Sequence, residues 1–198
     1  MKGNWGKAVM FAAIVALLGV GGIIAGQVIY REVAGNGSTV PIGGDFTLVN
    51  LDGETVRDGD YRGKNMLVFF GYTHCPDFCP FSLDTIGGAL DKMAPEKVDD
   101  LEVLFITVDP ERDTVDVMKD YVGFFHPKIQ GLTGTTDQVK SAARAYRIYF
   151  QKVEREEGPY LMDHSTYIYL MDENGRYVTH VTEDMGADVI AERLSQNI

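Results

Sequence analysis

The chain has 198 residues, 45% of them hydrophobic, and its formal net charge is -11 at pH 7. A chain of this length and composition can build one domain with a substantial core, whereas two complete domains would be crowded. Because residues 1–40 are slightly basic, the negative charge is concentrated in residues 41–198, which argues against nucleic acid as a partner and leaves no basic surface for anionic lipid.

Residues 8–30 form an uncharged segment dominated by alanine, valine, isoleucine, leucine and glycine. As a helix with a rise of about 1.5 Å per residue, the segment would reach roughly 35 Å, enough to cross a bilayer core of about 30 Å. A cleaved signal peptide is the alternative, but its apolar part is usually about 7–15 residues long and ends near an A-x-A cleavage site. This segment is longer and no clear site of that kind follows it, so we expect an uncleaved transmembrane helix.

The charges beside this helix predict its orientation. Lys2 and Lys7 precede it, and positively charged residues next to a transmembrane helix stay on the cytoplasmic side. Residues 1–7 should therefore be a cytoplasmic N-terminus, and the body of the protein should lie on the periplasmic side or in an equivalent intermembrane space. Residues 31–40 include Gly-Asn-Gly-Ser-Thr and are expected to be a flexible tether. Residues 41–198 would then be the soluble domain of a single-pass membrane protein.

Strands and helices alternate along this expected domain. Continuous or alternating apolar residues predict strands, and apolar residues three or four apart predict helices. The expected strands are residues 46–49, 55–56, 65–71, 101–108, 148–153, 167–171 and 177–181, with a turn at Asp52-Gly53 between the first two. The expected helices run from just after Cys79 to about residue 93 and over residues 115–125, 139–146 and 187–194. This order predicts an α/β domain with a thioredoxin-like fold, in which helices cover both faces of a mixed central sheet.

Both cysteines of the chain lie in one motif, Cys75-x-x-x-Cys79, directly after the predicted strand at residues 65–71. Pro80 suits the first turn of a helix, because its missing N–H would have no partner there. The motif therefore sits at a strand-to-helix turn, where backbone N–H groups and the positive end of the helix dipole favour thiolates. Both sulfurs are candidate nucleophiles or metal ligands. Outside the cytoplasm they would oxidise to a disulfide unless a reductant or a metal held them.

The spacing of the two cysteines favours a metal over a disulfide. If the turn is helical, residues four apart have Cβ atoms about 5–6 Å from each other, whereas a relaxed disulfide needs about 3.8 Å. A disulfide can form with local adjustment. A metal with metal–sulfur bonds of about 2.3 Å bridges the gap more easily, and it then needs a third ligand.

Four histidines compete for that role. His74 is next to Cys75, but adjacent side chains tend to diverge. His126 stands at a predicted helix end, where it would complement the dipole, and His180 lies near the end of the last strand. His164 comes shortly before the last but one predicted strand, and in thioredoxin-like folds this loop lies against the cysteine turn. A histidine there can reach the sulfurs, although a loop histidine bonded to backbone is the simpler alternative.

Two aspartates follow the predicted strand at residues 101–108. Asp109 stands where ligands and catalytic groups gather in open α/β sheets, and Asp113 with Thr114 is typical of a helix cap. Arg112 is expected to pair with one of the two aspartates. We predict that Asp109 and Asp113 lie around the cysteine site or on a partner-binding surface, without binding metal themselves.

Three motifs of the chain strongly resemble the signatures of one family. They are GYTHCPDFCP at residues 71–80, VDPERDT at residues 108–114 and DHS at residues 163–165. Together they resemble the Sco/SenC family of membrane-anchored, thioredoxin-like copper proteins that serve cytochrome c oxidase assembly. The resemblance implies that Cys75, Cys79 and His164 bind copper. It also implies delivery to the CuA domain of cytochrome c oxidase subunit II, with an upstream copper donor and a thiol reductant as further partners.

The chemistry of these three ligands agrees with copper. Soft thiolates favour Cu(I), and an imidazole suits Cu(I) and Cu(II) alike. A structural zinc site normally needs four protein ligands, and only three are evident.

Two functions are then in competition. The first is a copper metallochaperone, which is not an enzyme. The second is a thiol-disulfide reductase, which would use Cys75 and Cys79 as a redox dithiol to keep the cysteines of its target reduced for metallation. His164 discriminates between the two functions, because only a copper carrier needs the imidazole.

Overall fold

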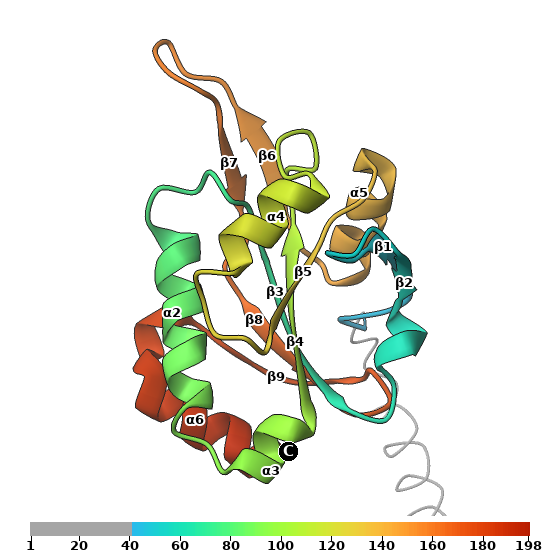
Figure 1. Ribbon diagram of the computed structural model, residues 1–198, viewed down its shortest axis with the longest axis vertical. Coiled ribbons are helices and arrows are strands. Elements are labelled where there is room, and N and C mark those ends of the chain that lie inside the picture. Colours follow the sequence, from blue (N-terminus) through green and yellow to red (C-terminus); the bar gives the residue numbers. More distant parts are fainter. Residues whose placement is uncertain (1–40) are drawn as a thin grey trace, which may run out of the picture. The chain divides into compact units, whose positions relative to one another are not determined.

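The computed structural model describes residues 41–198 (Figure 1). The expected cytoplasmic N-terminus, transmembrane helix and tether lie outside the described residues. Within residues 41–198, no helix has both the length and the apolar character that spanning a membrane requires.

The described residues form nine strands, five α-helices and two short 3₁₀ helices. The strands are β1 (Thr47–Val49), β2 (Thr55–Arg57), β3 (Asn65–Gly71), β4 (Leu101–Thr107), β5 (Ile129–Leu132), β6 (Phe150–Val153), β7 (Leu161–His164), β8 (Ile168–Met171) and β9 (Tyr177–Val181). The helices are η1 (Asp58–Tyr61), α2 (Phe78–Leu90), α3 (Pro95–Asp99), α4 (Val115–Val122), α5 (Thr136–Ala145), η2 (Glu183–Met185) and α6 (Gly186–Asn197).

A mixed five-stranded sheet, with the strand order β5-β4-β3-β8-β9, forms the centre of the domain (Figure 1). β3 and β4 are parallel, as are β4 and β5, whereas β8 is antiparallel to both β3 and β9. Gly71 of β3 pairs with Thr107 of β4, and Phe69 of β3 pairs with Ile168 of β8. The carboxyl ends of β3 and β4 and the amino end of β8 therefore meet at one edge of the sheet.

The two central strands are covered on both faces. Every residue of β3 after the first is buried, and so is every residue of β4 except the second, as their almost continuously apolar sequences predict. Gly71 faces α2, because a Cβ atom there would lie 2.7 Å from the Sγ of Cys79. Phe70 faces the opposite side, where its ring contacts that of Tyr146, directly after α5. The expected mixed sheet with helices on both faces is confirmed, and α2 packs against α6 on one of them (Figure 1).

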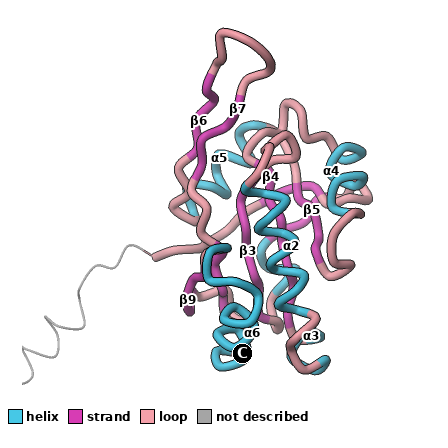
Figure 2. The backbone as a smooth tube through the Cα atoms, turned by 90° about the vertical axis from the view of Figure 1, so that its left-hand side faces the viewer, coloured by secondary structure: helices cyan, strands magenta, loops and turns pink. Residues whose placement is uncertain are grey.

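Two pairs of strands lie outside the central sheet. β1 and β2 form the antiparallel hairpin that the sequence predicts around Asp52-Gly53. β6 and β7 form a second antiparallel hairpin, which projects from the rest of the domain (Figures 1 and 2). Among the described strands, β6 and β7 form no ladder with the central sheet.

Most predicted elements are present with shifted ends. β3 has the expected bounds, but the helix expected after Cys79 already begins at Phe78, and it ends at Leu90. β5, β7 and α3 have no counterpart in the sequence-based prediction. β5 and β7 have only four residues each and include polar residues or glycine, so their apolar pattern is weak. They become strands because neighbouring strands supply their hydrogen-bond partners.

Candidate metal centre

The two cysteines lie at the turn between β3 and α2. The N–H of Cys75 donates to the carbonyl of Tyr72 at 3.3 Å, which closes a turn just after β3. Cys79 is the second residue of α2, and its N–H donates to the Sγ of Cys75 at 3.4 Å. Cys79 is fully buried, Cys75 is partly exposed, and both thiols are free. The strand-to-helix position is confirmed, but the helical spacing assumed for the pair is wrong, because α2 begins after Cys75.

His164 reaches the cysteines from the β6–β7 hairpin. It is the last residue of β7 and pairs with Phe150, so it ends a strand and does not lie in the loop that the sequence predicts. Its Nδ1 lies 2.9 Å from the carbonyl oxygen of Ser165. This oxygen can only accept, so Nδ1 carries the proton and the lone pair of Nε2 is free. Nε2 lies 3.7 Å from the Sγ of Cys79, and the ring of Tyr72 packs edge-to-face on the imidazole.

The ligand atoms of Cys75, Cys79 and His164 lie within 4.8 Å of one another. Within residues 41–198, no other three histidine, cysteine or acidic side chains come together in this way. A metal with bonds of about 2.0–2.3 Å to nitrogen and sulfur can join two atoms up to about 4.6 Å apart. Small shifts therefore suffice for all three atoms to bind one ion. Two thiolates and an imidazole suit a soft or borderline metal such as copper.

The two thiols differ in acidity. The hydrogen bond from the Cys79 thiol lowers the pKa of Cys75 to about 4 in spite of partial burial. The same hydrogen bond, together with burial, raises the pKa of the Cys79 thiol. Cys75 is thus the thiolate, and Cys79 keeps its proton in the metal-free form. The sequence predicts that the helix start favours thiolates at both sulfurs, and this holds for Cys75 alone.

Asp113 holds the segment that precedes Cys75. Its carboxylate is fully buried and accepts hydrogen bonds from the N–H of Thr73 at 3.0 Å and from the hydroxyl of Thr73 at 2.6 Å. The hydroxyl of Thr107, the last residue of β4, donates to the same carboxylate at 2.7 Å. The side chain that caps α4 belongs to Thr114. Asp113 is therefore not the cap, and it ties the cysteine turn to the end of the neighbouring strand.

Asp109 is the second residue after β4 and is nearly fully buried. Its carboxylate pairs with the Nε of Arg112 at 2.5 Å and accepts a hydrogen bond from the hydroxyl of Tyr160 at 2.9 Å. The expected pairing of Arg112 with one of the two aspartates is confirmed. Neither Asp109 nor Asp113 is a member of the Cys-Cys-His group.

The other three histidines lie away from the ligand atoms. His74 is exposed and contacts the hydroxyl of the preceding threonine. His126 lies 3.6 Å from Asp91, and His180 packs among exposed tyrosines. None of them joins the Cys-Cys-His group.

The ligand group opens into a hollow of about 490 Å³. Cys75 and His164 line it together with Phe78 and Tyr149, which are both 58% exposed.

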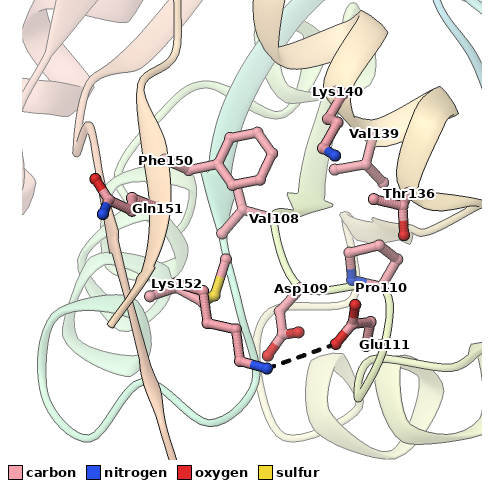
Figure 3. A pocket seen from close by; sticks show the side chains of 11 residues that line it. Val108, Asp109, Pro110, Glu111, Thr136, Val139, Lys140, Phe150, Gln151 and Lys152 are labelled. Carbon is pink, nitrogen blue, oxygen red and sulfur yellow. Dashed lines mark ion pairs between the residues drawn. The ribbon is translucent and has the colours of Figure 1, made fainter. Parts of the chain in front are cut away.

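A second cavity, of about 250 Å³, lies between the loop after β4, α5 and β6 (Figure 3). The sequence carries no signal for either cavity or for the contact of Tyr160 with Asp109. All three depend on where the β6–β7 hairpin packs against the rest of the domain.

The SCO1/SenC family model matches residues 34–198 of the chain. Protein SCO1 homolog 1 of Arabidopsis thaliana, a mitochondrial protein, is 41% identical over 157 residues, which cover 79% of this chain and 47% of that protein. The chain thus spans about half the length of this relative.

Solved structures share the fold of the described residues. The structure of Bradyrhizobium japonicum ScoI with copper bound has a TM-score of 0.73 and 41% sequence identity, and the match covers 79% of this chain and 99% of that chain. The structure of BsSco has a TM-score of 0.62 and 21% identity, covering 81% of this chain and 95% of that chain. BsSco is described as a member of the Sco family of cytochrome c oxidase assembly proteins, and at this identity the likeness concerns the fold alone.

Proposed function

The chain belongs to the SCO1/SenC family, and from this premise we propose that it is a copper metallochaperone for cytochrome c oxidase. It binds copper as cargo through the sulfurs of Cys75 and Cys79 and the Nε2 of His164. The copper-bound structure of Bradyrhizobium japonicum ScoI, 41% identical, supports copper as the bound ion.

The observation that carries the proposal is the convergence of the three donor atoms within 4.8 Å. Cys75 is already a thiolate, and Nε2 of His164 has a free lone pair, so two ligands are ready to bind. Cys79 must lose its proton when copper binds, and binding should therefore release a proton. Two thiolates stabilise Cu(I), and the imidazole lets the same site accept Cu(II).

The burial of the three ligands indicates the side from which copper is exchanged. Cys79 is fully buried, whereas Cys75 and His164 are partly exposed and line the open hollow. An incoming ligand from a donor or acceptor protein can therefore approach copper beside Cys75 and His164. Cys79 would then be the last ligand to release the ion.

The proposed acceptor is the CuA domain of cytochrome c oxidase subunit II, with an upstream copper donor and a thiol reductant as further partners. The link of the Sco family to oxidase assembly supports this assignment. In the proposed topology, residues 1–7 are cytoplasmic, residues 8–30 span the membrane and residues 31–40 tether the domain of residues 41–198. The domain faces the periplasm or an intermembrane space, and the mitochondrial Arabidopsis relative fits the second setting.

The difference between the two thiols favours a second function, thiol-disulfide reduction. The Cys75 thiolate is partly exposed and would attack a disulfide of the target, forming a mixed disulfide and releasing one target thiolate. The Cys79 thiol, once deprotonated, would then attack Cys75, releasing the second target thiolate and leaving a Cys75–Cys79 disulfide. A thiol reductant must restore the dithiol after each turnover.

Replacing His164 by alanine separates the two functions. The variant should keep its fold and its dithiol, but it should bind copper much more weakly and lose the visible absorption of a Cu(II)–thiolate site. Metal analysis with visible and EPR spectra of residues 41–198, before and after reduction, measures both effects. His180→Ala, outside the ligand group, is the matched control.

Cellular assembly of the oxidase gives the second readout. His164→Ala should fail to restore oxidase activity in cells that lack the protein, although it still reduces a small disulfide in vitro. A variant that binds copper like the wild type, or that restores the oxidase, would reject the chaperone and favour the reductase.

A further inference from the structure

The ligands of the proposed copper site stand on two separate parts of the domain. Cys75 and Cys79 follow β3 of the central sheet, whereas His164 ends β7, which among the described strands pairs only with β6. A two-stranded hairpin by itself is at best marginally stable in water. The position of His164 relative to the sulfurs therefore depends on the contacts that hold the hairpin to the domain.

Apolar packing supplies only part of this attachment. No residue of β6 is fully buried, and β7 buries Met162 alone. On the side of α5, the cavity of about 250 Å³ lies between β6 and the loop that carries Asp109 and Glu111 (Figure 3). Polar contacts must therefore contribute to the position of the hairpin.

Asp109, Arg112 and Tyr160 make these contacts, and we call them the latch. Tyr160 immediately precedes β7, and its hydroxyl donates to Oδ1 of Asp109 at 2.9 Å. Arg112 donates from Nη1 to the carbonyl of Tyr160 at 3.0 Å, and its guanidinium carbon lies 3.6 Å from the centroid of the Tyr160 ring. Its Nε pairs with Oδ2 of Asp109. Arg112, which lies in the loop after β4, thus joins Asp109 of that loop to the residue that precedes β7.

Two of the three latch residues, Asp109 and Arg112, are largely shielded from water, which strengthens the contact between them, whereas Tyr160 is partly exposed. Asp109 is 3% exposed, and the Arg112 side chain is 16% exposed. Hydrogen bonds to charged groups are roughly twice as strong as neutral ones. Lys152 of β6 adds an ion pair with Glu111 at 4.0 Å (Figure 3), but both side chains are exposed, and such pairs contribute little.

The latch is also connected to the histidine. Tyr160 begins the segment that ends four residues later in His164. The guanidinium of Arg112 lies 5.9 Å from the ring centroid of Tyr72, and this ring packs edge-to-face on the imidazole of His164. We propose that the latch positions His164 for copper binding, so that Arg112 and Tyr160 are positioning residues of the metal site. The inference rests on the proposed function, and the experiment below also tests it without copper.

The first measurement is amide hydrogen exchange of the metal-free full chain in detergent. Arg112→Gln should lower the protection of the β7 amides at least about tenfold, because it removes charge-assisted hydrogen bonds. Tyr160→Phe keeps the ring beneath the guanidinium and loses only the hydroxyl, so its effect should be smaller, roughly fivefold. Arg155→Gln changes an exposed arginine of the same hairpin and should leave the protection unchanged. Unaltered protection of β3 shows that each variant is folded.

The second measurement follows His164 itself. In the metal-free chain, the NMR signals of its ring protons should shift in Arg112→Gln and in Tyr160→Phe, and stay unchanged in Arg155→Gln. With copper, the affinity of Arg112→Gln should fall roughly tenfold, and its Cu(II) spectrum should move toward that of His164→Ala.

The outcomes distinguish a failure of the positioning role of the latch from a failure of the proposed copper-binding function. The inference would be overturned if the β7 amides of both latch variants were as well protected from exchange as those of the wild type. It would also be overturned if this protection fell while the NMR signals of the His164 ring and the copper spectra stayed unchanged. If the wild type bound no copper, the proposed function would fail, while exchange and ring signals would still decide whether the latch positions His164.

Discussion

Replacing Asp113 by alanine should destabilise the domain and loosen the turn before Cys75. The fully buried carboxylate accepts three hydrogen bonds, two from Thr73 and one from Thr107. The hydroxyl of Thr107 is buried, and a buried donor without a partner costs about 1–3 kcal/mol. Thr73 is partly exposed, so its two donors can bind water, and their loss costs about 0.5–1.5 kcal/mol each.

Removing a buried charge also relieves its desolvation, which offsets part of this loss. We therefore expect the free energy of unfolding to fall by about 3 kcal/mol, out of the roughly 5–15 kcal/mol typical of a domain. The amide of Thr73 should also exchange faster, because the carboxylate is its hydrogen-bond acceptor.

Urea unfolding of residues 41–198, followed by circular dichroism, measures the change. A domain of similar extent is known from Bradyrhizobium japonicum ScoI, where the match covers 99% of the solved chain. Asp120→Ala, an exposed aspartate of α4, is the control and should change the free energy by less than about 0.5 kcal/mol. An equally small effect of Asp113→Ala would refute the conclusion that this carboxylate holds the cysteine turn.

The remaining predictions concern the cysteines and the membrane. Gly71→Ala should destabilise the domain by about 1–3 kcal/mol and perturb the copper spectrum, because the new Cβ would lie 2.7 Å from the Sγ of Cys79. Gly59→Ala, where a Cβ meets nothing within 4 Å, is the control, and equal unfolding curves for the two variants would contradict the prediction. The hydrogen bond from Cys79 lowers the pKa of Cys75 to about 4, so alkylation of Cys75 should slow only as the pH falls through about 4. A midpoint near the ordinary thiol value of about 8.5 would contradict this. If residues 8–30 are an uncleaved anchor, the chain should resist a carbonate wash of the membranes with its N-terminus intact, and a soluble form that begins near residue 30 would rule the anchor out.

The features that depend on local chemistry can be predicted from the sequence of this protein. The apolar runs at residues 65–71 and 101–108 predict central strands, because a strand covered on both faces has no polar side. The motif of Cys75 and Cys79 predicts a strand-to-helix turn with two soft ligands, because donor chemistry belongs to the residue type. The α/β class and the mixed sheet follow from the order of such segments.

The features that join distant segments required the tertiary structure. His164 and Cys79 are 85 residues apart in the chain, and they meet because β8 lies antiparallel to β3 and β6 pairs with β7. The division of roles between Asp109 and Asp113, and the part of Tyr160 in the latch, likewise depend on which side chains face each other after folding. Side-chain periodicity reports the faces of one strand or helix at a time, whereas the pairing of distant strands follows from the packing free energy of the whole domain. The sequence by itself therefore determined the kinds of ligand, and the fold decided which of them meet.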